Sequence, residues 1–270
     1  MPADRERHPI TRISLDEGLL RTDQEAFEQH LYRQASELAR EFEIPELRFE
    51  QREVDRAEVE KKVADLSRLF HFDLSPVLKL ELFPGLQLIN PLYDVSWNVG
   101  SGMPLSHWDG KPMVFGGNGF SGSGFGVNLT TSKHVTVSAI PWGQFKAGWV
   151  NFDPPSALRS AGGTGAVVYA DGNLVLSREP RVWDVRSPGQ YTSGNWDQPY
   201  GSTATPPLTG SFGTVPLAPV LFDMLPGKRY QLWFWVWHLN EAIEGKSFIA
   251  FASADIPAIA ITVSDPLFIH

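Results

Sequence analysis

Residues 230–238 read YQLWFWVWH, and this stretch carries the strongest structural signal in the chain. Successive side chains of a β-strand point to opposite faces of the sheet. A strand here puts one set of side chains on each face: Tyr230, Leu232, Phe234, Val236 and His238 on the first, and Gln231, Trp233, Trp235 and Trp237 on the second. Large apolar side chains dominate both sets, so we expect a strand that is covered on both faces.

The second face leaves two alternatives open for Trp233, Trp235 and Trp237. Helices or a long loop cover the indoles, or the indoles form an exposed platform for sugar rings or a partner protein. An aromatic side chain buries about 150–250 Å², so three exposed indoles without a ligand would be costly. We therefore favour burial beneath N-terminal helices. Small neighbours that would leave room for the rings occur at Ala250, Ala252 and Ala254.

From about residue 76 onward the chain is rich in strand and turn signals. Apolar residues alternate with polar ones or form short runs at 77–83, 86–89, 135–139, 166–177, 182–185 and 248–263. Asp171-Gly172 suits a type I′ turn inside one of these runs, because both positions of that turn take a positive φ. Short strands without intervening helical patterns predict a predominantly antiparallel β-sandwich over residues 76–270.

The approach to the Trp-rich strand has the spacing of a tyrosine corner. Pro226-Gly-Lys-Arg-Tyr230 places a phenol where it can tie the preceding loop to the strand. This spacing favours an immunoglobulin-like arrangement, and a jelly roll is the other candidate subtype.

The N-terminal part has a different character. Residues 1–13 predict a flexible terminus, and residues 14–75 a helical segment with helices over about 23–42 and 56–70. The first helix carries an apolar face at steps of three and four, formed by Phe27, Leu31, Ala35, Leu38 and Phe42. The helices either pack on the sandwich or join copies of the chain into a homo-oligomer. The predicted class is therefore α+β.

Residues 116–126 read GGNGFSGSGFG, and Gly117, Gly119 and Gly122 match the dinucleotide fingerprint G-x-G-x-x-G. That fingerprint needs a helix directly after it and an acidic residue about twenty positions further on. Residues 123–131 are rich in Gly and Thr, and no Asp or Glu follows within that distance. We therefore predict a hairpin turn, anchored by Phe120 and Phe125, and no nucleotide cofactor.

Residue types with catalytic chemistry are sparse. His107 and Asp109 are two positions apart, so a strand would place both on one face as an acid/base pair or as metal ligands. His134 and His238 would join them only through the fold. His107 and Asp109 are accordingly weak catalytic candidates, and no metal site is predicted.

A second candidate region is the stretch 187–218, where prolines are scattered among Gly, Ser and Thr. A loop of this length in a compact domain is functional or mobile. Its aromatic residues Tyr191, Trp196 and Tyr200, together with Trp108, are candidate ligand-binding residues. The alternative is that they pin the loop onto the core.

Composition excludes several classes of function. The chain has 270 residues, a net charge of −8 and no cysteine. The acidic balance argues against a nucleic-acid partner, and the lack of cysteine excludes disulfides and thiolate catalysis. No apolar run approaches the roughly 18 residues of a membrane span, so integral membrane association is not expected. The N-terminus lacks the apolar core of a signal peptide, which predicts a cytoplasmic protein or release without a cleavable signal.

These observations predict a non-enzymatic β-sandwich protein with a binding or structural role, whose ligand is a carbohydrate or a protein surface. Two alternatives stay open. One is a hydrolase or metal-assisted enzyme that uses His107, Asp109 and loop carboxylates. The other is a toxin-like protein that acts on membranes after residues 116–132 rearrange into a hairpin.

Overall fold

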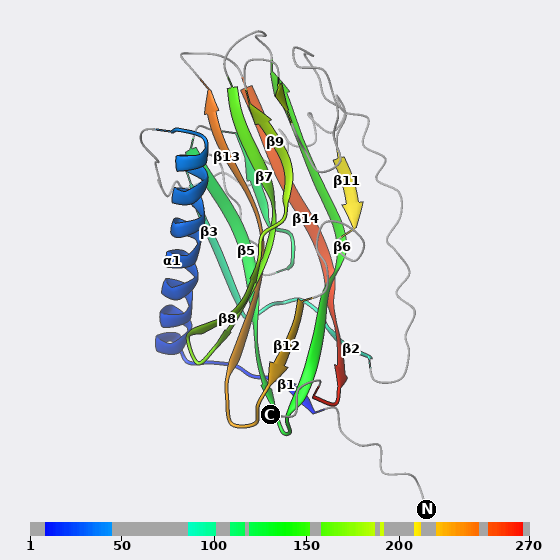
Figure 1. Ribbon diagram of the computed structural model, residues 1–270. Coiled ribbons are helices and arrows are strands. Elements are labelled where there is room, and N and C mark those ends of the chain that lie inside the picture. Colours follow the sequence, from blue (N-terminus) through cyan, green and yellow to red (C-terminus); the bar gives the residue numbers. More distant parts are fainter. Residues whose placement is uncertain are drawn as a thin grey trace, which may run out of the picture.

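The computed structural model (Figure 1) describes residues 9–44, 86–100, 109–116, 119–151, 158–186, 190–191, 208–211, 220–242 and 248–266. These residues form two antiparallel sheets that pack face to face, with one helix, α1 (Glu17–Glu41), on the outer face of the first sheet. The prediction of antiparallel sheets with an N-terminal helix is confirmed. None of the described helical residues forms a stretch apolar and long enough to cross a bilayer.

Within the described residues the first sheet has eight strands, and the Trp-rich strand lies at its centre. Its main path runs in the order β1 (Ile10–Arg12), β5 (Gly119–Thr131), β13 (Tyr230–Ala242), β7 (Leu158–Ala170), β9 (Arg181–Arg186) and β10 (Gln190–Tyr191). Two further strands join this path, β3 (Val95–Gly100) beside β5 and β8 (Asn173–Arg178) beside β7.

The second sheet, with six strands in the described part of the chain, closes the other side of the core. Its path runs β11 (Leu208–Ser211), β6 (Val135–Asn151), β14 (Phe248–Ser264) and β2 (Leu86–Ile89), with β12 (Val220–Met224) beside β6 and β4 (Met113–Phe115) beside β14. The interior between the sheets is filled by apolar side chains from both, including Leu232, Phe234, Val137 and Ile259. One face of β13 is therefore buried in the sandwich.

Several local predictions hold in detail. Asp171 and Gly172 have φ values of 48° and 79° and connect β7 to β8 as a two-residue turn. The hydroxyl of Tyr230 accepts a hydrogen bond from the backbone N–H of Leu225 at 2.9 Å, as the tyrosine-corner spacing predicts. β14 continues through Pro257 as a single strand, with an irregular register between Asp255 and Ala258.

The predicted hairpin turn at residues 116–126 is wrong from Gly119 onward. Residues from Gly119 onward belong to β5, which pairs with β13 on one side and with β1 and β3 on the other. Phe120 and Phe125 are not turn anchors, because they lie within the strand and point into the two different cores. The glycines from Gly119 to Gly126 belong to this long central strand.

α1 begins earlier than the apolar period indicates. The Asp16 side chain accepts a hydrogen bond from the N–H of Leu19 at 2.9 Å and caps the helix. A carboxylate at this position is a favourable N-cap, which sets the start ahead of the first apolar residue of the stripe. The predicted helix at 56–70, the run at 77–83 and the proposed boundary near residue 75 lie outside the described residues.

Candidate functional site

The outer face of β13 is covered by α1. Trp233, Trp235 and Trp237 are each no more than 1% exposed. Phe27 of α1 stacks on Trp233 with ring centroids 4.3 Å apart and meets Trp235 edge-on at 5.2 Å. The alternative of an exposed indole platform is therefore wrong, and the alternative of burial beneath an N-terminal helix is confirmed.

Glycines on the strands next to β13 make room for the indoles. On β5, Gly126, Gly124 and Gly122 lie opposite Trp233, Trp235 and Trp237 in that order. On the other side, two glycines of β7 lie opposite the last two of these indoles, Gly165 beside Trp235 and Gly163 beside Trp237. A Cβ atom at Gly124 would lie 2.7 Å from Cβ of Trp235, which is too close for any side chain.

The alanines proposed for that purpose lie elsewhere. Ala250, Ala252 and Ala254 belong to β14 and pair with β6 in the second sheet. Ala252 and Ala254 line the core between the sheets. The apparent nucleotide loop is thus part of a groove of glycines that accommodates the indoles under α1.

Charged pairs fix α1 along both ends of its contact with the sheet. Arg229 forms two hydrogen bonds with the carboxylate of Asp23, whose side chain is 1% exposed. At the other end, Arg181 forms two hydrogen bonds with Glu41, with N–O distances of 3.1 and 2.6 Å. Since the apolar face of α1 is already used within the chain, an oligomer would have to use its other faces.

The middle of α1 contacts the connection between β8 and β9. Nε2 of His30 contacts Oε1 of Glu179 and lies 3.2 Å from the hydroxyl of Ser177. A Ser-His-acid triad needs the acid on the imidazole nitrogen opposite to the one that faces the serine. Here a single nitrogen meets both groups, so this cluster joins helix to sheet and does not have triad geometry.

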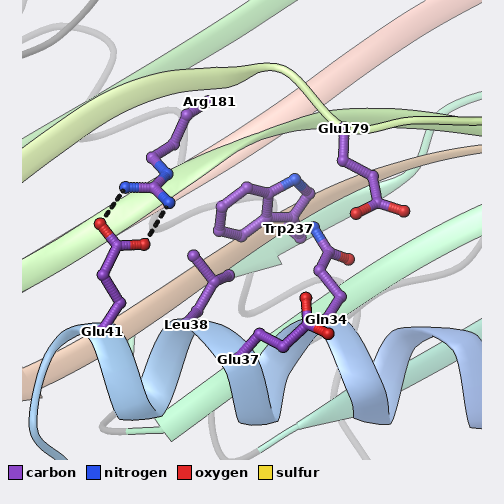
Figure 2. Close-up of a pocket in the computed structure, with 7 residues that line it drawn as sticks. All are labelled: Gln34, Glu37, Leu38, Glu41, Glu179, Arg181 and Trp237. Carbon is purple, nitrogen blue, oxygen red and sulfur yellow. Dashed lines mark hydrogen bonds and ion pairs between the residues drawn. The ribbon is translucent and has the colours of Figure 1, made fainter.

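A cleft opens between the C-terminal half of α1 and the β8–β9 connection (Figure 2). Its volume is about 190 Å³. The lining residues come from α1, from the β8–β9 region and from β13: Gln34, Glu37, Leu38 and Glu41, then Glu179 and Arg181, and Trp237. The cleft therefore combines an indole and a leucine with charged and amide groups.

The polar groups of the cleft differ in how fully they are bonded. Hydrogen bonds with Glu41 raise the pKa of the Arg181 guanidinium, which keeps it charged. Gln34 is only 8% exposed, and its enclosed side-chain oxygen accepts no hydrogen bond from any described residue. A buried unsatisfied acceptor costs about 1–3 kcal/mol, so a hydrogen-bond donor brought to this amide would stabilise the protein.

Most of the site residues predicted from the sequence lie outside the described part of the chain. These are His107, Trp108, Trp196 and Tyr200. Tyr191 belongs to β10 at the edge of the first sheet, and Asp109 belongs to a turn before β4. Their catalytic and ligand-binding roles stay predictions.

The two histidines proposed to join His107 are far apart. His134 is exposed and lies 3.9 Å from Asp223, whereas His238 is fully buried and its Nδ1 lies 2.9 Å from Nδ2 of Asn240. His238 pairs with Ser121 near the start of β5, whereas His134 follows the end of β5 at Thr131. Ser121 and Thr131 are ten positions apart along the strand, which corresponds to roughly 33 Å. Within the described residues no three His, Asp or Glu side chains converge as metal ligands.

Comparisons with known proteins give no family. No family model and no curated protein matches the chain. Among solved structures the chain is similar to part of the crystal structure of a GH31 alpha-xylosidase from Xanthomonas citri, with 10% identity and a TM-score of 0.14. The match covers 54% of this chain and spans only 12% of the enzyme chain. A likeness at this level carries no argument about function.

The sequence predicts none of the cleft residues as site residues, and it offers Trp237 only in the alternative of an exposed indole platform. Gln34 had a signal, since it stands three residues after Leu31 and four before Leu38, on the apolar stripe of the helix. A polar residue at such a position is buried, and it needs a partner or a ligand. Glu179 and Arg181 had none, because only the fold brings them to the helix.

Proposed function

We propose that this protein is a non-enzymatic binding module whose ligand occupies the cleft between α1 and the β8–β9 connection. The observation that carries the proposal is the buried side-chain amide of Gln34, which forms no hydrogen bond with any described residue, in a cleft that Trp237 also lines. The lining is mainly polar, with Leu38 and Trp237 as its apolar part, so we expect a ligand that is held chiefly by polar contacts. The volume of about 190 Å³ is below the roughly 300–1,000 Å³ of typical pockets for drug-sized ligands. The ligand is therefore small, or a single side chain of a larger partner.

A binding role is favoured over catalysis because the groups nearest the cleft lack a catalytic arrangement. His30, beside the cleft, is held against Glu179 and Ser177 through a single nitrogen. The hydrolase alternative depends on His107, which lies outside the described residues. The membrane-acting alternative would require β5 to leave its partners β13 and β3.

Three finer expectations belong to this proposal. The sandwich is expected to have an immunoglobulin-like or jelly-roll topology, and the tyrosine corner at Tyr230 supports the first of these. The ligand is expected to be a carbohydrate or a protein surface, and the chain is expected to assemble into a homo-oligomer. The cleft supports a protein partner that inserts one side chain.

The proposal is tested by a fragment screen with NMR detection on the 15N-labelled protein. We expect fragments that shift the indole N–H signal of Trp237 together with the side-chain amide of Gln34. Gln34→Lys fills the cleft and should abolish the shift of the Trp237 signal, whereas Gln29→Lys, on the exposed face of the same helix, should keep the shifts of both signals. A screen in which no fragment shifts these signals, or in which Gln34→Lys leaves the Trp237 shift intact, would contradict the proposal.

A further inference from the structure

The inner face of the first sheet changes from apolar to polar along β13. Leu232, Phe234 and Val236 face the core between the two sheets. Since side chains on one face recur every second residue, the next two on this face are His238 and Asn240. Both are no more than 1% exposed. Polar groups buried this deeply need hydrogen-bond partners in the interior.

The two neighbouring strands add hydroxyl groups to the same region. Val236 lies opposite Ser123 of β5 on one side and opposite Thr164 of β7 on the other. Directly opposite residues share a face, so both hydroxyls point into the core, and both residues are 0% exposed. His238 is two residues further along β13 and therefore lies diagonal to both. Its own partner on β7 is Gly162, whose missing side chain leaves space beside the imidazole.

Hydrogen bonds determine which imidazole nitrogen of His238 carries the proton. Burial lowers the pKa of His238 to about 3, so the ring is neutral at pH 7. The hydroxyl of Ser160 donates to Oδ1 of Asn240 at 2.7 Å, which turns Nδ2 of Asn240 toward the histidine. Nδ2 is a donor only, and it lies 2.9 Å from Nδ1 of His238. Nδ1 is therefore the acceptor, and the proton is on Nε2.

Three polar groups of this region form no hydrogen bond with any described residue. They are Nε2 of His238 and the hydroxyls of Ser123 and Thr164. Ser123 and Thr164 are separated by two strand spacings of about 4.8 Å each, with Val236 between them, so their hydroxyls are too far apart to bond to each other. The three groups need a partner that both accepts and donates hydrogen bonds.

We propose that bound water occupies this part of the core and connects the imidazole N–H of His238 to the hydroxyls of Ser123 and Thr164. Water accepts a hydrogen bond from Nε2 and donates to a hydroxyl oxygen, and a buried water makes about three such bonds. Two bonds of about 2.8 Å span less than the distance between the hydroxyls, so the site holds at least about two waters. The site lies on the opposite face of the first sheet from the cleft beneath α1 and does not depend on it.

A high-resolution crystal structure of the protein is the direct test. We expect ordered water within about 3.2 Å of Nε2 of His238 and of the hydroxyl oxygens of Ser123 and Thr164. NMR of the 15N-histidine-labelled protein at pH 7 should show the His238 proton on Nε2. A core without water beside Nε2, a protein acceptor bonded to Nε2, or a proton on Nδ1 would each overturn the proposal.

Water 17O relaxation dispersion, which counts long-lived internal waters, tests the same site in solution. The double variant Ser123→Ala/Thr164→Val removes both hydroxyls, and we expect it to hold about two fewer long-lived waters than the parent. Thr11→Val removes a hydroxyl from an exposed position of β1 and should leave the number unchanged. An equal number in the parent and the double variant would contradict the proposal. If the double variant does not fold, the crystal structure of the parent decides alone.

Discussion

Gly165 and Trp235 lie opposite each other on neighbouring strands, and a Cβ atom at Gly165 would lie 2.1 Å from the indole carbons Cε2 and Cζ2 of Trp235. Trp235 is also closely packed on its other side, because a Cβ atom at Gly124 would lie 2.7 Å from Cβ of Trp235, and Phe27 meets the indole edge-on. The indole therefore occupies the space that a side chain at position 165 would need, and Cβ of Trp235 occupies the space that one at position 124 would need.

Gly165→Ala should consequently destabilise the protein strongly. Overpacking a dense core costs about 1–3 kcal/mol and occasionally more, and we expect the upper end of this range in urea denaturation. The double variant Gly165→Ala/Trp235→Leu should recover part of the loss, because the smaller side chain frees the space. Additive effects of the two changes would contradict the packing that we describe.

Phe27 is the residue through which α1 covers the indoles, so Phe27→Ala should uncover them. It contacts Trp97, Trp233 and Trp235 with centroid distances of 5.2, 4.3 and 5.2 Å. Replacing a buried phenylalanine by alanine costs about 3–5 kcal/mol. We also expect a red shift of tryptophan emission in the folded variant. Leu19→Ala, at a helix position that is 43% exposed, is the control and should change neither quantity appreciably.

Arg229 and Asp23 form the most buried charged pair between α1 and the sheet, so Arg229→Leu should leave a carboxylate buried without its partner. Removing one member of a buried pair costs about 3–5 kcal/mol. Burial raises the pKa of Asp23, and the loss of the nearby guanidinium would raise it further. We therefore expect the destabilisation in urea to be largest at pH 7 and to shrink toward pH 4, where Asp23 takes up a proton.

The matched control for this change is Arg21→Leu. Arg21 lies on the same helix and pairs with Glu25, but its side chain is 83% exposed. Exposed pairs contribute about 0–1 kcal/mol, so the control should unfold nearly as the parent does at both pH values. Equal losses for the two variants would show that the Asp23 pair is no more important than a surface contact.

The parts of this fold that follow from the sequence are those with a local cause. The alternation at 230–238 predicts β13 and the burial of both its faces, and the stripe from Phe27 to Phe42 predicts the buried face of α1. Asp171-Gly172 predicts its own turn, because the φ values that it tolerates belong to those two residues.

The parts that could not be predicted depend on pairing between distant residues. The glycines of residues 119–126 match a turn or a nucleotide loop equally well until the register places them beside Trp233, Trp235 and Trp237. Asp23 and Gln34 stand on the apolar stripe of the helix and predict two buried polar groups. The partner of Asp23 is 206 residues away, and the space beside Gln34 is formed by the β8–β9 connection, so neither outcome follows from the helix itself.

His238 makes the stability of the protein depend on pH in a predictable direction. It is fully buried, and burial lowers the pKa of its imidazole from 6.5 to about 3. Below pH 6.5 the unfolded chain therefore binds a proton that the folded chain does not bind. Since stability rises with pH wherever the unfolded state holds more protons, the free energy of unfolding should fall as the pH drops from 6.5 toward 3, by up to about 1.4 kcal/mol per pH unit.

His238→Gln removes this proton while keeping a side chain that can accept the hydrogen bond from Asn240, since Nδ1 of His238 lies 2.9 Å from Nδ2 of Asn240. Urea denaturation of both proteins at pH 7, 5.5 and 4.5 isolates the effect, because every other titrating group is common to the two. We expect the parent to lose stability relative to the variant at each step below pH 6.5. Parallel pH profiles would mean that the imidazole takes up its proton in the folded state at its ordinary pKa, and that the interior around it admits solvent.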